Sequence, residues 1–479
     1  FGMSSVVDRF AQIEPKVLIT VDGYRYGGKT FNRIEEIEQI IQQLPSLKEV
    51  VLIPYLNFNS TISFTNTTNW AKINMAIRTP LSFTRIEFNE PIWVLYSSGT
   101  TGKPKAITHS VGGVLLEHLK YLTFHNDVKS GERYFWYTTT GWMMWNYMQA
   151  SLLCGATIVL YDGSPAYPEI SAMWQFIEEA KITHFGTSAG FISASFSANV
   201  TPSKTFNLSS LRSIGSTGSP LSPENFDWIY QEVKPDVWLA SISGGTDVCS
   251  AFVGGNPLLP VYSGEIQCRA LGCKLKAYNE AGQPVLKQMG EMVITKPMPS
   301  MPIFFWGDAD YKKYTESYFE MYPGIWRHGD WIEITKRNSV IIYGRSDSTL
   351  NRGGIRIGTS EIYRAVESLD YIKDSLVIYL DKDKQDYMPL FVVLKDGLNL
   401  KDGIIKTIKT TIRKAYTPRH VPDKIIQITE VPYTISGKKM ETPIKKILLG
   451  QPTEKVVSKD AMRNPEAIEF FVNLKNTSR

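Results

Sequence analysis

Apolar and polar positions in the first sixty residues follow the pattern of a strand, a helix and a second strand. The runs "KVLIT" and "EVVLIPYL" are typical of buried strands, and between them apolar residues recur at helical spacing from Ile34 to Leu44. Asn32 stands before this helical pattern as a candidate N-cap, and Pro45 follows it as a stop. The pattern predicts one strand–helix–strand unit of an α/β sheet.

The same alternation resumes after a polar stretch. Residues 56–90 are rich in Asn, Thr and Ser with weak periodicity, which predicts mostly loop. Further on, the strand-like runs "ATIVLYD", "DVWLASIS" and "EMVITKP" alternate with the helical patterns "SAMWQFIEEAK" and "PENFDWIYQEV". An α/β fold with a large, doubly wound N-terminal domain is therefore expected.

The pattern changes near "VIIYGRSDSTLNRGG", which reads as a hairpin. It is followed by a helix, "SEIYRAVESL", a strand, "DSLVIYLD", and a lysine-rich helix, "KDGIIKTIKTTIRKAY". The change predicts a domain boundary near Asp347, with an N-terminal domain at 1–346 and a small C-terminal α+β domain at 347–479.

Composition narrows the class of protein. The 479 residues carry 52 Lys and Arg against 47 Asp and Glu, a net charge of +5, which is too mild to indicate nucleic-acid binding but suits an anionic ligand. Four cysteines without a CxxC pair predict unpaired thiols in a reducing compartment, the cytosol, and no structural metal. No apolar run approaches the roughly 18 residues that span a bilayer, so membrane insertion is not expected.

One stretch concentrates the chemistry of phosphate binding. "SSGTTGKPK" (Ser97–Lys105) places glycines, hydroxyls and lysines directly after the apolar run "WVLY". Backbone N–H groups of a glycine-rich turn bind phosphate oxygens, and hydroxyls and lysine add further donors. The P-loop of NTPases is excluded, because only two residues separate Gly99 from Gly102 and a proline follows Lys103. The alternatives are a phosphate-binding loop of another kind and an ordinary polar turn.

This loop closely resembles the signature loop of the adenylate-forming enzymes, the superfamily of acyl-CoA synthetases, adenylation domains and luciferases. Four later stretches resemble the superfamily's other motifs in the correct order: "SGGTD" (Ser243–Asp247, with Asp where Glu is usual), "WRHGDW", "GRSDSTLNRGGIRIGTSEI" and "ISGKK". Longer stretches, among them "TKPMPSMPIFFWGDAD" and "YPGIWRHGDW", look most like acetoacetate-using acyl-CoA synthetases, and this similarity covers essentially the whole chain.

The resemblance implies a ligase with a two-step reaction. A carboxylate attacks the α-phosphorus of ATP to give an acyl-adenylate and pyrophosphate, and the CoA thiolate then displaces AMP. The implied cofactors are ATP, Mg²⁺ and coenzyme A, and the implied partners are small molecules, with protein partners unknown. Two alternatives remain: a synthetase for another short-chain acid (acetate, propionate or butyrate), and an inactive nucleotide-binding fragment.

Matching the motifs residue by residue implies the nucleotide contacts. They are Ser97, Ser98, Gly99, Thr100, Thr101, Gly102 and Lys103 on the β- and γ-phosphates, Thr246 on the α-phosphate, Asp247 on Mg²⁺, Asp330 and Arg345 on the ribose, and Gly218, Ser219 and Pro220 around the adenine. Plainer structural roles are the alternatives: a turn or capping residue for Asp247, a surface ion pair for Asp330 and Arg345, and a simple loop at 218–220.

The remaining implied roles concern the second domain and the acid. Lys438 of "ISGKK" would join the attacking carboxylate to the α-phosphate, with a solvated lysine as the alternative. Asp347 would be the hinge, and Gly353, Gly354 and Arg356 would contact CoA unless they form only a hairpin turn. The acyl pocket would comprise Trp142, Met143, Met144 and Gly244, although "GWMMWN" is also typical of core. Acetate-using relatives carry a tryptophan at the position of Gly244, so glycine would leave room for a longer acid.

The position of the signature loop is unusual for this resemblance. In synthetases of this kind it lies well over two hundred residues into the chain, whereas here it begins at residue 97. The expectation is a short N-terminal domain, from a fragment, an isoform or a gene-model effect, with an unpaired sheet edge and exposed apolar surface.

Overall fold

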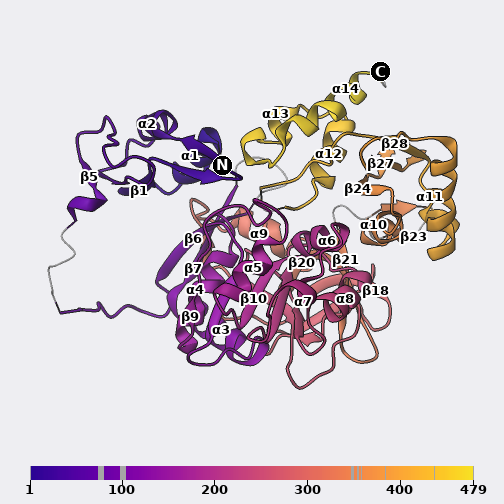
Figure 1. The fold of residues 1–479 in the computed structure, drawn as a ribbon, viewed down its shortest axis with the longest axis horizontal. Helices are drawn as coiled ribbons and strands as arrows, with labels where there is room; N and C mark the ends of the chain where they lie inside the picture. Colours follow the sequence, from indigo (N-terminus) through magenta and orange to yellow (C-terminus); the bar gives the residue numbers. More distant parts are fainter. Residues whose placement is uncertain are drawn as a thin grey trace.

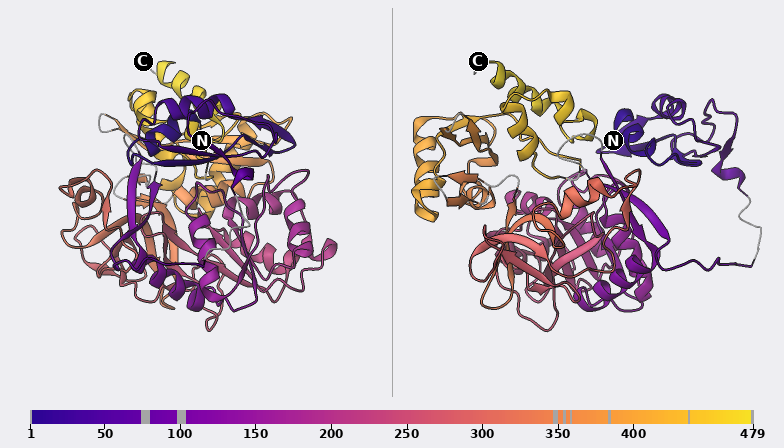
Figure 2. Two further views of the ribbon diagram at one scale, coloured as in Figure 1. Left: turned by 90° about the vertical axis from the view of Figure 1, so that its left-hand side faces the viewer. Right: turned by 180° about the vertical axis from the view of Figure 1, so that it is seen from behind.

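The computed structural model describes residues 2–73, 80–97, 104–346, 350–352, 355–357, 359–382, 385–435 and 437–477. An N-terminal unit (indigo) and a C-terminal unit (orange to yellow) lie side by side over one end of a larger central body (Figures 1 and 2). None of the helices formed by these residues combines the length and apolar character needed to cross a bilayer.

The N-terminal unit confirms the predicted strand–helix–strand pattern. Its elements are α1 (Met3–Phe10), β1 (Val17–Val21), β2 (Gly23–Tyr26), β3 (Lys29–Asn32), α2 (Ile34–Gln42), β4 (Glu49–Ile53) and β5 (Thr67–Asn69). Strands β1 and β4, which come before and after α2 in the chain, pair directly with each other in parallel. The Asn32 Oδ1 accepts a hydrogen bond from the Ile34 N–H at 3.0 Å, so it caps the start of the helix, although Arg33 holds the N-cap position itself. The helix ends at Gln42, ahead of Pro45.

These strands do not join the main sheet. β1, β4 and β5 form a three-stranded sheet of their own, over a separate core that includes Ile37, Ile41, Val50 and Leu52. The expected loop at 56–90 also contains the short strand β5. Periodicity predicts that a segment is a strand but does not say which sheet it enters, because that choice depends on contacts far away in the sequence.

The central body contains the expected doubly wound parallel sheet. Its strand order is β12-β11-β10-β8-β9, with bounds β8 (Arg133–Trp136), β9 (Thr157–Ile158), β10 (His184–Ser188), β11 (Ser213–Thr217) and β12 (Trp238–Ser241). One face packs on α5 (Ala172–Glu179), α6 (Ala189–Ser197) and α8 (Pro223–Trp228), and the other on α3 (Val111–His125) and α4 (Met144–Gln149). Alternate side chains of β8 serve the two faces, because Phe135 enters one core and Tyr134 and Trp136 the other.

Antiparallel sheets, which the sequence did not predict, complete the central body. They are β19-β7-β6, β13-β14-β15 and β17-β16-β18-β20-β21. The bounds are β6 (Pro91–Ser97), β7 (Lys105–Ser110), β13 (Ser243–Gly245), β14 (Ser250–Gly254), β15 (Cys268–Arg269), β16 (Leu275–Tyr278), β17 (Pro284–Val285), β18 (Met289–Ile294), β19 (Phe304–Phe305), β20 (Trp326–Ile334) and β21 (Val340–Arg345), with α9 (Lys312–Tyr318) between β19 and β20. Strands β7 and β20 matter most below, because they carry residues of the site.

The C-terminal unit has the predicted α+β content. It comprises β22 (Leu350–Arg352), β23 (Ile355–Ile357), α10 (Thr359–Glu367), β24 (Ile372–Val377), β25 (Leu380–Lys382), β26 (Gln385–Tyr387), β27 (Pro389–Leu394), α11 (Asp402–Ala415), β28 (Lys424–Gln427), α12 (Glu441–Leu448), α13 (Thr453–Val456) and α14 (Glu469–Thr477). The sheet β24-β27-β28 has a core on each face, since Leu390 and Phe391 of β27 point to opposite sides.

Apolar side chains also lie in solvent, as expected from the short N-terminal domain. On α3 the exposed residues are Leu115, Leu116, Leu119 and Phe124. Strand β6 pairs with β7 alone among the described strands, so it forms a sheet edge.

Candidate active site

The candidate site lies at the carboxyl ends of the parallel strands, where ligands of open α/β sheets bind. Gly218 directly follows β11, and Gly244 to Asp247 follow β12. The Thr217 Oγ1 donates a hydrogen bond to the Ile242 carbonyl at 3.1 Å, which ties the two strand ends together. Gly218 has a φ of +92°, a left-handed conformation that favours glycine. The structure thus brings the 218–220 and 243–247 motifs to one edge of the sheet.

The Asp247 carboxylate is held from two sides. The Tyr318 hydroxyl donates a hydrogen bond to Oδ1, and the Lys105 Nζ lies 3.6 Å from the same oxygen. Burial alone would raise the pKa of Asp247, but the charge of Lys105 and the Tyr318 hydrogen bond hold this pKa well below its usual range. Asp247 is therefore an anion at neutral pH, with 17% of its side chain exposed.

Asp330 and Arg345 form the second part of the site. They face each other across the antiparallel pair β20–β21, and the Arg345 Nη1 donates to the Asp330 Oδ1 at 3.1 Å. Gly329 has a φ of +87°, and a Cβ at this position would lie 2.9 Å from the Arg345 guanidinium. The left-handed backbone at Gly329 favours glycine, and the pairing of β20 with β21 brings the two motifs together.

His328 lies between the two carboxylates. Its Nε2 is 3.7 Å from the Asp330 Oδ2, and its ring packs edge-on against Phe252 with centroids 4.5 Å apart. Burial lowers the pKa of His328, and Arg345 and Lys438 lower it further, while Asp330 and Asp247 oppose them. The imidazole is consequently neutral at physiological pH.

Lys438 reaches this group from the C-terminal unit. The residue is exposed, yet neighbouring atoms desolvate its amine and this lowers its pKa; Arg345 lowers it further, and Asp330 and Asp247 act against both. Lys438 is therefore electrostatically coupled to the two carboxylates and to the arginine.

The neighbouring lysine has a different task. The Lys439 Nζ forms ion pairs with Glu367 at 2.6 Å and Asp374 at 2.9 Å, and it lies 4.0 Å from the centre of the Tyr363 ring. Burial lowers the pKa of Lys439, but the two carboxylates outweigh burial and raise it well above its usual value. Lys439 therefore anchors the loop within the C-terminal unit, whereas Lys438 is coupled to the carboxylates of the site.

The predicted acyl pocket is brought together only in part. A Cβ on Gly218 would lie 3.9 Å from the Trp142 ring, so these two residues adjoin. Met144 is 2% exposed and belongs to the core, whereas Trp142 and Met143 pack at the edge of that core.

Packing against β14 explains why residue 244 is a glycine. A Cβ there would lie 2.0 Å from the Ser250 carbonyl oxygen and 2.4 Å from the Ala251 Cα. Glycine is required by the close approach of β14, so the argument that glycine lengthens the acyl pocket gains no support from this backbone.

Several predicted residues lie outside the described part of the chain. They are Ser98, Gly99, Thr100, Thr101, Gly102, Lys103, Asp347, Gly353 and Gly354. Arg356 is described only as backbone, in β23. Ser97 ends β6 with a buried Oγ that has no partner among the described residues, Thr246 is half-buried, and Ser219 and Pro220 are exposed.

Sequence reasoning missed three residues of the site. Lys105 and His328 stand inside stretches that were already singled out, so their positions were a usable signal. Tyr318 lies at the end of α9 outside every motif, and nothing in the sequence pointed to it.

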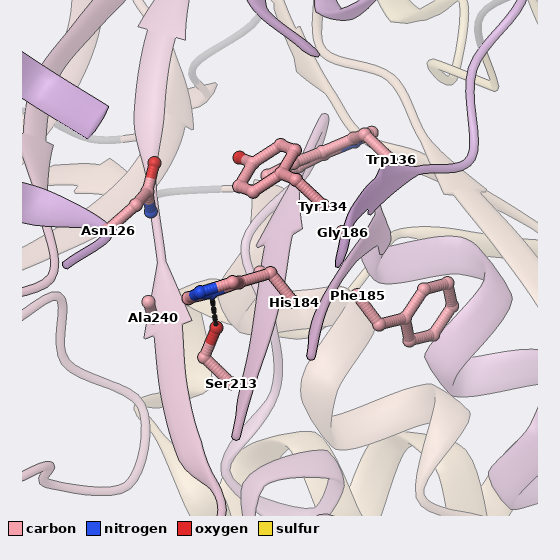
Figure 3. A pocket seen from close by; sticks show the side chains of 9 residues that line it. Asn126, Tyr134, Trp136, His184, Phe185, Gly186, Ser213 and Ala240 are labelled. Atoms are coloured by element: carbon pink, nitrogen blue, oxygen red, sulfur yellow. Dashed lines mark hydrogen bonds between the residues drawn. The ribbon is translucent and has the colours of Figure 1, made fainter. Parts of the chain in front are cut away.

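A small cavity elsewhere in the central body does not belong to this site. It is lined by residues of the parallel sheet and its flank: Asn126, Tyr134, Trp136, His184, Phe185, Gly186, Ser213, Gly215 and Ala240 (Figure 3). Its free volume of about 10 Å³ holds about one water molecule. The His184 Nδ1 and the Ser213 Oγ lie 2.6 Å apart at its floor.

Comparison with known proteins places the chain in a family. A sequence model of the AMP-binding enzyme family matches residues 2–302. The acetoacetyl-coenzyme A synthetase of Rhizobium meliloti (strain 1021) is 44% identical over 99% of this chain and 73% of that protein, and the acetoacetyl-CoA synthetase of Gallus gallus is 41% identical over 99% and 72%. The solved acetoacetyl-CoA synthetase of Streptomyces lividans superposes with a TM-score of 0.93 at 47% identity, over 100% of this chain and 73% of that one. The chain belongs to the AMP-binding enzyme family and, within it, to the acetoacetyl-CoA synthetases.

Proposed function

We propose that the chain is an acid–thiol ligase that converts acetoacetate and coenzyme A to acetoacetyl-CoA, with ATP cleaved to AMP and pyrophosphate. The observation that carries the proposal is the pair of carboxylates at this edge, Asp247 held by Lys105 and Asp330 held by Arg345, to which Lys438 of the C-terminal unit is electrostatically coupled. A lysine, two carboxylates and an arginine at the carboxyl edge of an α/β sheet suit a nucleotide and an organic acid.

In the first half-reaction an acetoacetate oxygen attacks the α-phosphorus and pyrophosphate leaves, which forms acetoacetyl-adenylate. Two anions must meet, so fixed positive charge and oriented donors lower the barrier. Lys438 is the residue suited to bridge the acid and the α-phosphate, and Thr246 offers its hydroxyl to the same phosphate. The 97–103 loop would hold the β- and γ-phosphates.

The nucleoside contacts follow from the same placement. Asp330 is buried and held by Arg345, so its carboxylate is oriented to accept both ribose hydroxyls. The turn at Gly218, Ser219 and Pro220 would line the adenine. Trp142 adjoins this turn and would line the pocket for the acid.

Asp247 fits a Mg²⁺ ion that arrives with the nucleotide. Oδ1 is occupied by Tyr318 and Lys105, whereas the described residues donate no hydrogen bond to Oδ2. The described residues contain no cluster of three His, Cys, Asp or Glu side chains that could hold a metal alone. One carboxylate oxygen, completed by phosphates and water, is the usual protein contribution to a Mg²⁺ site. The ion would offset the charge of the departing pyrophosphate.

The second half-reaction transfers the acyl group to the CoA thiolate and releases AMP. We assign residues 1–346 and 347–479 to two domains, with Asp347 as the hinge and with Gly353, Gly354 and Arg356 on the CoA. All four cysteines are free thiols, which suits a reducing compartment, and we place the protein in the cytosol.

The test is acid-dependent formation of AMP. The purified chain is incubated with ATP, Mg²⁺, CoA and either acetoacetate, acetate, propionate or butyrate, and AMP and acyl-CoA are quantified. Acetoacetate is expected to give the highest kcat/KM. A preference for butyrate or propionate would assign another short-chain acid, and ATP binding without AMP formation from any acid would reject a ligase activity.

A further inference from the structure

The turn that carries Asp247 has a strained backbone. The Cys249 N–H bonds the Thr246 carbonyl at 3.2 Å, and Cys249 itself has a φ of +44°. Residues other than glycine rarely adopt this conformation, which persists only where the surroundings fix it. Something outside the turn must therefore hold it.

Two buried histidines bond the turn. The His109 Nε2 lies 2.9 Å from the Asp247 carbonyl oxygen, and the His118 Nε2 lies 2.6 Å from the Cys249 carbonyl oxygen. Both rings are at most 1% exposed. A buried carbonyl left without its partner costs about 1–3 kcal/mol, so each bond matters to the turn.

The orientation of His109 is fixed by a third residue. The Trp93 Nε1 lies 3.2 Å from the His109 Nδ1, and an indole N–H is only a donor. Nδ1 must therefore accept, and the imidazole carries its proton on Nε2, which donates to the Asp247 carbonyl. Burial lowers the pKa of His109 to about 4, consistent with this neutral form at physiological pH.

His109 also shares a strand with Lys105. Both belong to β7, four positions apart, and therefore point to the same face of that strand. From this face His109 bonds the main chain of Asp247, and Lys105 approaches its carboxylate. Strand β7 thus contacts both the main chain and the side chain of Asp247.

We propose that His109, oriented by Trp93, is a positioning residue for the Asp247 carboxylate. It fixes the backbone from which that carboxylate meets the metal-bound triphosphate, and this role rests on the function proposed above. Loss of the Nε2 donor would let the strained turn relax and move the carboxylate, while the rest of the nucleotide site stays in place.

The test compares ATP affinity with and without metal. Calorimetry measures the Kd of a non-hydrolysable ATP analogue in Mg²⁺ and in EDTA, for the wild type, His109→Leu and His109→Gln. Leucine removes the donor, whereas a glutamine amide supplies one in a similar position. His125→Leu is the matched control, because this buried histidine also bonds backbone, at the Gly255 carbonyl and the Leu271 N–H, but not the Asp247 turn.

The quantity compared is the ratio of the Kd in EDTA to the Kd in Mg²⁺. We expect this ratio to be at least tenfold smaller in His109→Leu than in the wild type, and His109→Gln to restore most of it. Trp93→Phe, which removes only the orienting N–H, should shift the affinity in the same direction by less. His125→Leu should lower the Tm and keep the full gain. An equal gain in His109→Leu and His125→Leu would overturn the proposal. Binding of Mg²⁺–ATP by a wild type that forms no AMP from acetoacetate would reject the proposed reaction instead, and the calorimetric comparison would still decide the role of His109.

Discussion

The Lys105 ammonium lies 3.6 Å from the Asp247 carboxylate. This ion pair joins strand β7, near the start of the central body, to a turn that is more than a hundred residues later in the chain. The same amine lies 5.0 Å from the centre of the Tyr318 ring, and the Tyr318 hydroxyl bonds the same carboxylate oxygen. These three side chains form one unit at the carboxyl edge of the sheet. Aspartate has a shorter side chain than the glutamate that is usual in this motif. Lys105 and Tyr318 fix the position of its carboxylate.

Removing the Lys105 charge should weaken nucleotide binding. We expect Lys105→Met to raise the KM for Mg²⁺–ATP by about 10- to 100-fold, equivalent to about 1.4–2.8 kcal/mol, because Asp247 then repels the triphosphate without compensation. Steady-state kinetics with varied ATP measure this effect. The control is Lys120→Met, since Lys120 pairs with the buried Glu117 at 2.7 Å away from the site. Similar KM changes in both variants would contradict the assignment.

The two adjacent lysines should separate by phenotype. Lys438→Ala is expected to slow adenylate formation by about 10²–10³, the effect of losing one transition-state donor, with little change in Tm. Thioester formation from supplied acetoacetyl-adenylate should suffer far less, which rapid-quench measurement of each half-reaction checks. Equal loss in both half-reactions would refute the role.

Lys439→Met should instead act on stability. Its removal leaves Glu367 and Asp374 without their common cation, and because both carboxylates are partly exposed to solvent the expected cost is about 1–2 kcal/mol. Urea unfolding of the full chain measures the change. A stable Lys439→Met protein with slow adenylation would mean that the two lysines have been assigned the wrong way round.

Gly244 offers a test of packing against specificity. Because a Cβ would lie 2.0 Å from the Ser250 carbonyl oxygen, Gly244→Ala should lower the free energy of unfolding by about 1–3 kcal/mol through overpacking. Differential scanning calorimetry reports the shift in Tm, with Gly403→Ala, which meets open space on α11, as the control. A stable Gly244→Ala variant that prefers acetate over acetoacetate would restore the pocket-length interpretation.

Stability at low pH should depend on Glu132. Burial alone would raise the pKa of Glu132, but hydrogen bonds from His184 and Arg212 lower it to about 2. Since the folded pKa is below the ordinary value of 4.5, this stabilisation is complete above pH 4.5 and is lost as the pH falls toward 2. Glu132→Gln should lose about 1.5–3 kcal/mol at pH 7, as expected for hydrogen bonds to a charged group, and flatten the acid side of the curve. Denaturant unfolding from pH 7 to pH 3 measures both effects, and an unchanged pH profile in the variant would contradict the assignment.

The local elements and most of the motif positions are evident from the amino-acid sequence. The apolar spacing around Ile37 and Ile41 predicted α2, and the five motifs in their order indicated the family. These features depend on neighbours in the chain, which a periodicity or a short motif records.

The tertiary structure alone decided which distant groups meet. Strands β1 and β4 form their own sheet instead of joining the five-stranded one, and packing against β14 requires the glycine at position 244. Tyr318 and His109 contact Asp247, although no sequence motif indicated these contacts. Likewise, two consecutive lysines look alike in sequence, and only packing turns Lys439 into an anchor and leaves Lys438 facing the carboxylates. The physical reason is that hydrogen bonds and ion pairs act over a few ångströms, and only the folded chain sets which residues come that close.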